Sequence, residues 1–341
     1  MTNIVSVAKK LSSPFRTALA GVFLVVAHFR RFLPNVRKTW AGTKVDPDGR
    51  KFAVVVHFDK HGSIADYLFH TFAELTDAGY QIILVSNAPK LKTQDVELAR
   101  SHVHSIIHRY NSGYDFAAYR DGLAAVPDVD RLESLIIMND SVYGPLFSLK
   151  EQLSTVSPDS CDVWGITDSW ERRYHVQSYF MLFHATAIQS KAFCKFWKYM
   201  PNHVNKWAAI QNGELKLTNK LAGDKLRIAV QCPYWDVVRS VSEARSRSDE
   251  GDKDADGKIK IPTKQWENKK AIETALIGGN PINQSHFFWE TLIEDYKCLF
   301  LKRELIHSNP IGTPYPWRWR DVVKKQTNFD PELIERHLQS L

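Results

Sequence analysis

Between residues 52 and 107, strand-like apolar runs alternate with helical patterns, and this alternation constrains the fold more than any other feature. Phe52 to Phe58, Gln81 to Ser86 and Val103 to Ile107 are short apolar runs that favour buried strands. Helical spacing of apolar residues fills Ile64 to Ala78, and a second helix is expected over Thr93 to His102. Strand–helix–strand units form right-handed crossovers, so we predict an α/β fold: a Rossmann-type, mostly parallel sheet with helices on both faces.

The next apolar run, Leu135 to Met138, predicts a buried strand that ends in three oxygen-bearing side chains, Asn139, Asp140 and Ser141. In open α/β sheets, ligands lie just beyond the carboxyl ends of the strands. Side-chain oxygens at that edge could reach a sugar hydroxyl, a phosphate or a hard cation. The alternative is a simple turn, because Asn, Asp and Ser all favour turns.

The third predicted strand leads into a second candidate loop, Arg109 to Asp115. Asn111 and Gly113 predict a turn beside the proposed site, and Asp115 is expected to begin a helix that runs to about Ala125. Asp115 could bind a ribose or sugar hydroxyl, and Arg109 could bind a phosphate. For Asp115 the alternative is helix capping.

Two later strands are also predicted to carry polar or charged groups. Cys161 to Thr167 leads into Asp168, and Tyr179 to His184 is preceded by His175, Gln177 and Ser178. This repetition favours a ligand site over a set of unrelated turns. A further predicted strand, Cys298 to Leu305, contains Lys302 and Arg303. For the two cations, the alternative is a solvated strand end.

Other classes of protein are disfavoured by what the sequence lacks. No GxGxxG follows the first strand and no GxxxxGK[ST] occurs, which argues against a dinucleotide dehydrogenase or a P-loop NTPase. The four cysteines are scattered without a CxxC pair, so neither zinc nor a disulfide framework is indicated and a reducing, cytosolic environment fits best. Despite a formal net charge of +7, we expect no nucleic-acid partner.

Residues 1–50 differ in composition from the rest, and we expect them to form a membrane-associating segment and a linker. Thr17 to Phe29 is nearly all apolar and has basic residues on both flanks. The run is shorter than the roughly 20 residues of a membrane-spanning helix, so a helix lying in an anionic membrane surface is predicted. The alternative is a helix packed on the main domain.

The remaining chain is expected to form one domain, residues 51–325, followed by a C-terminal helix at 326–341. Residues 239–264 are rich in Ser, Arg, Asp, Glu and Lys, which predicts a charged insertion within that domain. A disordered loop and an active-site lid are both open interpretations of this insertion.

A set of blocks in order along the chain resembles the rhamnan synthesis protein F family of bacterial glycosyltransferases. The blocks are NSGYDFAAYRDGL, LIIMNDSVYGP, DVWGITDSW, HVQSYFMLF, NQSHFFWETLI and FLKRELIHSNP. The resemblance covers roughly residues 52–310 without the charged insertion. It implies a GT-A-like transferase that uses a nucleotide-diphosphate sugar and helps to assemble a rhamnose-containing cell-surface polysaccharide.

The resemblance also implies roles for particular residues. The position of the GT-A Asp-x-Asp motif, which holds a metal and the sugar nucleotide, reads Asn139-Asp140-Ser141, so only Asp140 offers a carboxylate to Mg²⁺ or Mn²⁺. Glu214 and the residues after it are similar to the segment in which an acidic residue opens a helix and acts as the catalytic base. Asp168 is the second choice for the base. For Glu214 the alternative is helix capping.

This chemistry needs those residue types. An acceptor hydroxyl loses its proton as it attacks the anomeric carbon, which calls for one positioned carboxylate. The departing diphosphate needs cations, supplied by a metal or by Lys302, Arg303 and His286. One carboxylate suffices for an inverting transfer.

We therefore expect transfer of a sugar such as L-rhamnose from dTDP-L-rhamnose to a growing, lipid-linked glycan. The expected location is cytoplasmic, peripheral on the inner face of the cytoplasmic membrane. The main rival is a non-catalytic scaffold or glycan-binding subunit of a polysaccharide assembly complex. A methyltransferase is a weaker rival, because the glycine-rich loop is absent.

Overall fold

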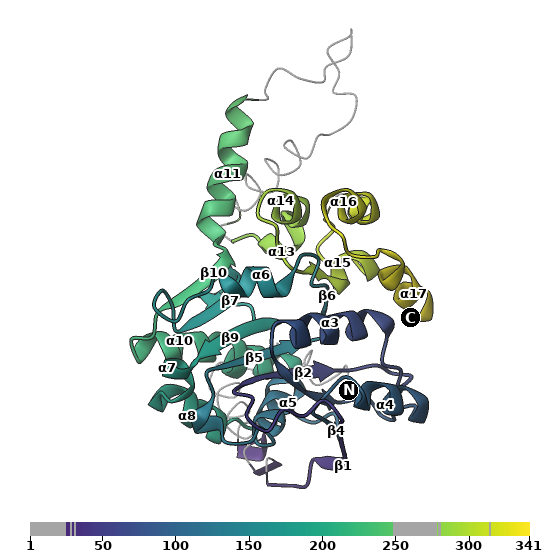
Figure 1. Cartoon of the computed structure of the whole chain (residues 1–341). Helices are drawn as coiled ribbons and strands as arrows, with labels where there is room; N and C mark the ends of the chain where they lie inside the picture. Colours follow the sequence, from purple (N-terminus) through teal and green to yellow (C-terminus); the bar gives the residue numbers. More distant parts are fainter. Residues whose placement is uncertain (1–24, 28, 31, 248–277, 279–280, 314) are drawn as a thin grey trace, which may run out of the picture.

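The computed structural model describes residues 25–27, 29–30, 32–247, 278, 281–313 and 315–341. A nine-stranded sheet forms its centre, in the order β1-β4-β3-β2-β5-β9-β7-β10, with β8 paired to β7 (Figure 1). The strands are β1 (Val36–Ala41), β2 (Lys51–His57), β3 (Gln81–Ser86), β4 (Ser105–Arg109), β5 (Ser134–Asn139), β7 (Val163–Ser169), β8 (His175–Val176), β9 (Phe180–His184) and β10 (Ile228–Cys232).

The sheet is mostly parallel, as predicted. The run β4-β3-β2-β5 is parallel, and its order is that of one doubly wound half. β9 runs antiparallel between β5 and β7, while β10 is again parallel to β7. Strands β3 and β5 are buried along their whole length, because helices cover both of their faces.

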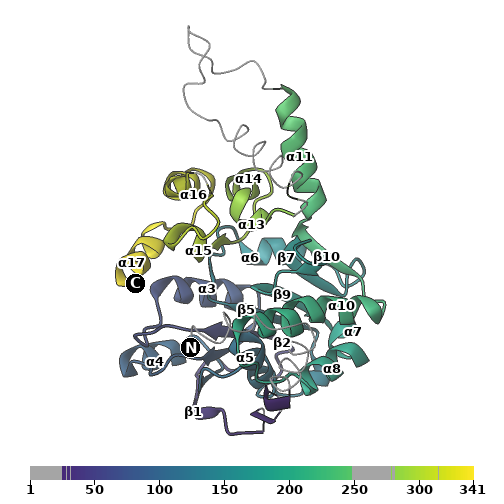
Figure 2. The ribbon, with the colours of Figure 1, turned by 180° about the vertical axis from the view of Figure 1, so that it is seen from behind.

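Helices cover the two faces of the sheet, which Figures 1 and 2 show in turn. One apolar core includes residues of α3 (Asp66–Asp77), α4 (Thr93–Arg100), α6 (Leu149–Ser154) and α11 (Tyr234–Arg247). The opposite core includes residues of α5 (Tyr114–Leu123), α7 (Ala185–Ile188), α8 (Lys191–Lys198) and α10 (Leu215–Gly223). The predicted α/β class with helices on both faces is therefore confirmed.

The C-terminal elements lie together at one end of the sheet, above α3 and α6 in Figure 1. They are α13 (Gln284–Phe287), α14 (Trp289–Glu294), β11 (Leu301–Lys302), α15 (Arg303–His307), the 3₁₀ turn η3 (Pro316–Arg318), α16 (Trp319–Gln326) and α17 (Glu332–Ser340). A second, two-stranded sheet joins β11 to β6 (Val142–Tyr143), directly after β5. This pairing brings the C-terminal residues to the edge where β5 ends.

Several predicted boundaries are wrong. Residues 1–50 do not all lie outside the domain, because β1 pairs antiparallel with β4 at the edge of the sheet. The predicted strand from Cys298 to Leu305 is only two residues long, since helix α15 begins at Arg303. The charged insertion does not begin at 239, because α11 continues to Arg247; its remainder lies outside the described residues.

The predicted amino-terminal helix falls only in part within the described residues. Residues 25–27 and 29–30 are helical, and most of the apolar run that predicts the helix lies outside the described residues. Among the residues that the structure describes, no helix combines the length and the apolar character that crossing a bilayer requires.

Candidate functional site

The polar residues after β5 form a bonded unit rather than a free set of ligands. Asn139 Nδ2 donates to Asp115 Oδ2 at 3.0 Å, which ties the end of β5 to the start of α5. Asn139 Oδ1 accepts from the backbone nitrogen and the hydroxyl of Ser141, at 3.1 and 2.5 Å. Asn139 and Ser141 therefore fix the loop and orient Asp115.

Asp140 makes an ion pair with Arg303, the first residue of α15. Arg303 Nη1 lies 3.1 Å from Asp140 Oδ2, and the backbone nitrogen of Phe58 donates to the same oxygen at 3.0 Å. Arg303 Nη1 also donates to the hydroxyl of Tyr67 at 3.0 Å. The pairing of β11 with β6 explains this meeting, because it lets Ser141 accept a backbone hydrogen bond from Arg303 at 3.0 Å.

Glu214 ends a π-helical segment, η2 (Ile210–Glu214), that joins α9 (Lys206–Ala209) to α10. It therefore lies inside a continuous helical stretch instead of opening a helix, and π segments are frequent at functional sites. Glu214 Oε1 accepts from the backbone nitrogen and the hydroxyl of Ser178, at 2.7 and 3.0 Å. These two bonds fix the direction of the carboxylate.

Gly213 allows η2 to approach α5 closely. A Cβ at this position would lie 2.6 Å from ring atoms of Phe116, so a larger residue would push the two segments apart. Tyr119, one turn further along α5, donates to the carbonyl of Ser178 at 3.0 Å. The helix that carries Asp115 and the segment that carries Glu214 are thus packed as one unit.

The charges of this region act on one another. Burial raises the pKa of Asp115 to about 6, and the negative charges of Asp140 and Glu214 add to the rise. Burial lowers the pKa of Lys302 to about 8, against the opposing effects of Glu214, Glu304 and Asp115. Lys302 Nζ lies 3.8 Å from the centre of the Tyr179 ring. The structure therefore brings three carboxylates and two cations together.

His286, on α13, lies near Lys302 but carries no positive charge at neutral pH. Burial lowers its pKa to about 4, and the charge of Lys302 lowers it further. Its Nδ1 is buried without a hydrogen-bond partner among the described residues. A neutral imidazole can donate a hydrogen bond, so a contact between His286 and a diphosphate stays a prediction.

The donor set does not fit a tightly held divalent cation. Asn139 and Ser141 bond to each other and to Asp115, while Asp140 is already neutralised by Arg303. In the part of the chain that the structure describes, no three His, Cys, Asp or Glu side chains converge as metal ligands. The cation beside Asp140 is a guanidinium of the protein itself.

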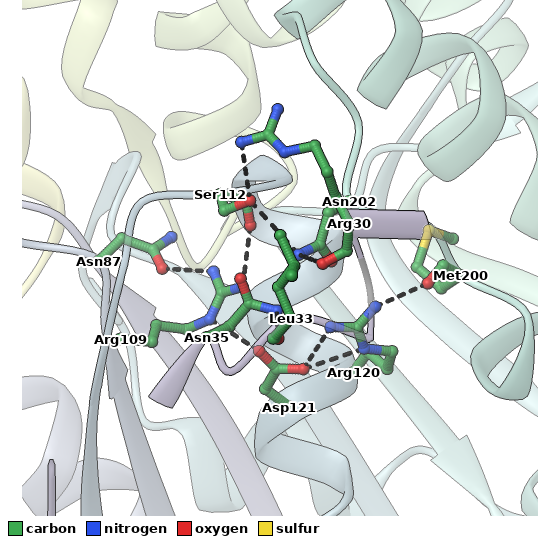
Figure 3. A network of polar contacts seen from close by, with 10 residues as sticks. All are labelled: Arg30, Leu33, Asn35, Asn87, Arg109, Ser112, Arg120, Asp121, Met200 and Asn202. Atoms are coloured by element: carbon green, nitrogen blue, oxygen red, sulfur yellow. Dashed lines mark hydrogen bonds and ion pairs between the residues drawn. The ribbon is translucent and has the colours of Figure 1, made fainter. Parts of the chain in front are cut away.

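Arg109 does not reach this site, and the expectation that it binds a phosphate is not supported by its position. Its side chain is fully buried, and all three nitrogens have protein partners (Figure 3). Nε donates to Asp121 Oδ2, Nη1 to Asn87 Oδ1 and Nη2 to the carbonyl of Ser112, at 2.8, 2.7 and 2.8 Å. Arg109 therefore holds the loop that leads to α5.

The other predicted residues of this loop differ in role. Gly113 has a left-handed φ of +84°, and a Cβ there would lie 2.8 Å from the Cα of Asn202, so this position requires glycine. Asn111 is exposed. The following Tyr114 is also left-handed, with φ of +58°, a strained conformation of the kind that collects at functional sites.

Asp168 is engaged in holding helix α11. Its Oδ1 accepts from the backbone nitrogen of Tyr234 at 2.7 Å and from Gln284 Nε2 at 3.2 Å. Asp168 is buried, and burial raises its pKa. These hydrogen bonds tie Asp168 to the starts of α11 and α13, which favours Glu214 over Asp168 as the base.

The sequence assigns no particular role to Ser178, Tyr67 or Tyr179. Ser178 orients Glu214, Tyr67 contacts Arg303, and the ring of Tyr179 supports Lys302. Tyr67 has the helical spacing of an ordinary core residue, so its position in the sequence gives no sign of a contact with Arg303. Ser178 does have a signal in the sequence, because it stands in the polar stretch directly before β9.

Comparison with known families gives a match over the part of the chain that carries most of this site. Residues 82–236 match the family model described as "Rhamnan synthesis protein F". That range contains Asp115, Asn139 to Ser141, Asp168 and Glu214. It does not contain Lys302 or Arg303.

Two bacterial proteins resemble the chain in sequence. "Uncharacterized protein y4gN" of Sinorhizobium fredii is 30% identical over 181 residues, which cover 50% of this chain and 47% of that protein. The chain thus spans about half the length of this relative. "Virulence protein VirA" of Vibrio anguillarum is 26% identical over 297 residues, which cover 85% of this chain and 91% of that one.

Among solved structures, the glycosyltransferase GlyE of Streptococcus pneumoniae TIGR4 has a TM-score of 0.41 to this chain, with 8% sequence identity over 86% of this chain and 64% of that one. The family match is the more specific finding, because it covers the first four of the six ordered motifs. The predicted resemblance to the rhamnan synthesis protein F family is confirmed over residues 82–236.

Proposed function

We propose that the chain is a GT-A-like glycosyltransferase that uses a nucleotide-diphosphate sugar. One observation carries the proposal: Asp115, Asp140 and Glu214 meet Lys302 and Arg303 at the carboxyl edge of a doubly wound sheet. This edge is where such folds bind their ligands. The family match over residues 82–236 supports the same class of reaction.

Lys302 and Arg303 stabilise the departing diphosphate in this proposal. Arg303 is held by Asp140 and by the hydroxyl of Tyr67, and it also interacts with Tyr143, so its guanidinium is fixed in position beside the candidate site. Lys302 adds a second positive charge one residue earlier. Preorganised cations that meet developing negative charge lower the barrier of group transfer. No step of the proposed reaction is assigned to a metal ion, because the donor set does not fit one.

Glu214 is the proposed general base. Ser178 holds Oε1, so Oε2 is the oxygen left to accept the proton of the acceptor hydroxyl. The bond from the acceptor oxygen to the anomeric carbon forms as the bond to the diphosphate breaks. A single base of this kind gives inversion at the anomeric carbon, because no covalent intermediate with the protein is formed.

Asp115 is the proposed ligand of a ribose or sugar hydroxyl. Asn139 orients it, and its raised pKa of about 6 leaves it mostly ionised at neutral pH, where a carboxylate accepts hydrogen bonds from hydroxyls. From the family resemblance, we propose L-rhamnose as the transferred sugar, dTDP-L-rhamnose as its donor, and a growing, lipid-linked glycan as the acceptor.

Transfer of labelled sugar tests this function. The purified full chain is given dTDP-L-rhamnose, UDP-sugars or GDP-sugars with a lipid-linked glycan acceptor, and labelled product is counted. We expect product from one donor and an inverted linkage by NMR. A protein that binds the glycan but none of the nucleotides would instead be the non-catalytic glycan-binding subunit.

We also propose that the amino-terminal side of the protein lies on an anionic membrane surface, which would place it on the cytoplasmic face of the inner membrane. Large apolar side chains are exposed there, namely those of Val25, Val26, Phe29, Phe32 and Leu33. A cavity of about 900 Å³ beside them is lined by Phe29 and by the lysines at 191, 195, 216 and 220. Apolar and basic groups together favour anionic lipid headgroups.

Vesicle flotation measures this association. Lys191→Glu with Lys195→Glu is expected to lower binding to phosphatidylglycerol vesicles, because two attractive charges become repulsive. Lys324→Glu with Lys325→Glu, on the distant helix α16, is the matched control and leaves binding unchanged. An equal loss in both double variants would indicate only a general charge effect and would contradict a docking face.

A further inference from the structure

Three aromatic rings gather on the surface beside β7, outside the residues used so far. Trp170 and Tyr174 lie in the connection between β7 and β8, and Trp235 lies in the first turn of α11. The Trp170 ring centre is 5.2 Å from that of Tyr174 and 5.9 Å from that of Trp235. Trp170 is 38% exposed and Trp235 is 55% exposed, so the cluster is not part of either core.

The cluster is anchored to the segment that holds the proposed base. Strand β8 runs from Tyr174 towards Ser178, whose nitrogen and hydroxyl orient Glu214. Asn219 of α10, five residues after Glu214, donates to the carbonyl of Tyr174 at 3.4 Å. Both connections tie the segment that carries Tyr174 to the segment that carries Glu214.

A carboxylate stands within the same connection. Glu171 follows Trp170 directly; its nitrogen donates to Ser169 Oγ at 3.1 Å, and its Oε2 accepts from Asn283 Nδ2 at 3.4 Å. Burial raises the pKa of Glu171, and the negative charge of Glu214 raises it further, so the two carboxylates are close enough to interact. The carboxylate can accept hydrogen bonds from hydroxyls, and the rings, tilted by 57° and 55° against one another, offer apolar faces beside it.

We propose that Trp170, Tyr174 and Trp235 form a stacking platform for a sugar ring of the acceptor glycan, with Glu171 accepting hydrogen bonds from its hydroxyls. This inference rests on the proposed function and names where its acceptor binds. A pyranose presents C–H groups on one face and hydroxyls at its edge. The C–H groups match the electron-rich faces of aromatic rings, and indole gives a large, rigid contact area at low entropic cost.

Direct sugar binding tests the platform without requiring turnover. The full chain is titrated with a panel of neutral di- and trisaccharides, including rhamnose-containing ones, and binding is measured by saturation-transfer NMR and tryptophan fluorescence. We expect at least one sugar to bind, and Trp170→Ala and Trp235→Ala each to weaken it by roughly tenfold. Trp170→Phe, which keeps a ring, retains most of the affinity.

Trp317→Ala is the matched control, because Trp317 is 69% exposed and lies on η3, outside the cluster. It leaves sugar affinity unchanged. Failure of the whole panel to bind would overturn the platform, and so would equal affinity in the Trp170→Ala, Trp235→Ala and Trp317→Ala variants. Circular dichroism confirms that each variant is folded.

Nucleotide binding separates this proposal from the proposed function. Thermal shifts with UDP, GDP and dTDP are expected to be the same in Trp170→Ala and in the unchanged chain. If nucleotides bind but the cluster variants keep full sugar affinity, the platform fails and the transferase stands. If sugars bind through the rings while no nucleotide binds, the transferase fails and the platform stands.

Discussion

Two arginine–aspartate pairs lie near the carboxyl edge of the same sheet, and their surroundings differ. In the first pair, Arg109 and Asp121 are joined at 2.8 Å, and the arginine side chain is completely buried. In the second, Arg303 and Asp140 are 3.1 Å apart, with side chains that are 19% and 13% exposed. The two aspartates are equally exposed, at 13%, so the pairs differ at the arginine, which is buried in the first and partly exposed beside the candidate site in the second.

The two guanidinium groups also differ in their partners. All three nitrogens of Arg109 donate to groups of the fold, and burial lowers its pKa. Arg303 is also desolvated, but the negative charge of Asp140 outweighs this effect and raises its pKa. Arg109 holds the fold, whereas Arg303 keeps its positive charge beside the residues of the candidate site.

The largest expected effect comes from Glu214, which belongs to the candidate site. Glu214→Gln removes the proposed base but keeps the acceptor oxygen for Ser178, so we expect kcat to fall by roughly 10²- to 10⁴-fold. Nucleotide affinity, measured by calorimetry, stays within experimental error. Asp168→Asn is the comparison variant; a greater loss of kcat there, at equal stability, would move the base to Asp168.

The pair of Arg109 and Asp121 is expected to govern stability. Asp121→Asn leaves Arg109 buried without its counter-charge, which costs about 3–5 kcal/mol of unfolding free energy. Asp121 also accepts from Arg120, at 2.9 and 2.6 Å, so the variant loosens both arginines. Urea denaturation measures the loss. A variant of unchanged stability but impaired nucleotide binding would reverse the roles assigned to the two pairs.

The pair of Arg303 and Asp140 is expected to govern ligand affinity. Arg303→Gln removes the charge-assisted hydrogen bonds to a diphosphate, worth about 1.5–3 kcal/mol, or roughly 10- to 100-fold in Kd. Asp140→Asn should have a smaller effect, since it frees the guanidinium rather than removing it. Calorimetry with UDP, GDP and dTDP gives both values; equal affinity in Arg303→Gln would rule out the proposed diphosphate contact.

The smallest effect concerns pH. The pKa of Lys302 is lowered to about 8, so the ammonium is charged below this pH and neutral above it. Nucleotide affinity should therefore fall by about tenfold as pH rises through 8 towards 9.5. Lys302→Arg, which stays charged, should keep its affinity over that range. A pH profile that is identical in the two proteins would assign the titration to another group.

The sequence alone predicted the strands and the polar loop after β5, but not the roles of the two arginines. Local patterns predicted strands β2, β3 and β5 and the polar residues after β5, because buried strands and their ends have short-range signatures. No local pattern predicts the different roles of Arg109 and Arg303, because in the sequence each is simply a positively charged residue at the end of a strand. Only long-range contacts distinguish them: Asn87 and Asp121 saturate Arg109, whereas the β6–β11 pairing brings Arg303 to Asp140.

The same limit applies to the contacts of Asp168 and to strand β1. Asp168 ends a buried strand as a ligand residue would, yet the helix that it holds begins 66 residues later. The strand Val36–Ala41 carries exposed, basic residues and no apolar alternation, so its place at the sheet edge depends on pairing with β4. The contacts of Asp168 and the position of β1 in the sheet both depend on segments that are distant in the sequence.

The central claim is that protein cations, rather than a divalent metal, hold the sugar nucleotide's diphosphate. Titration of the full chain with UDP, GDP and dTDP in EDTA, followed by thermal unfolding, tests it directly, because a ligand of the folded state raises its stability. We predict that at least one nucleotide raises Tm in EDTA and that Arg303→Gln abolishes this rise. Stabilisation that appears only when Mn²⁺ or Mg²⁺ is added would contradict the account.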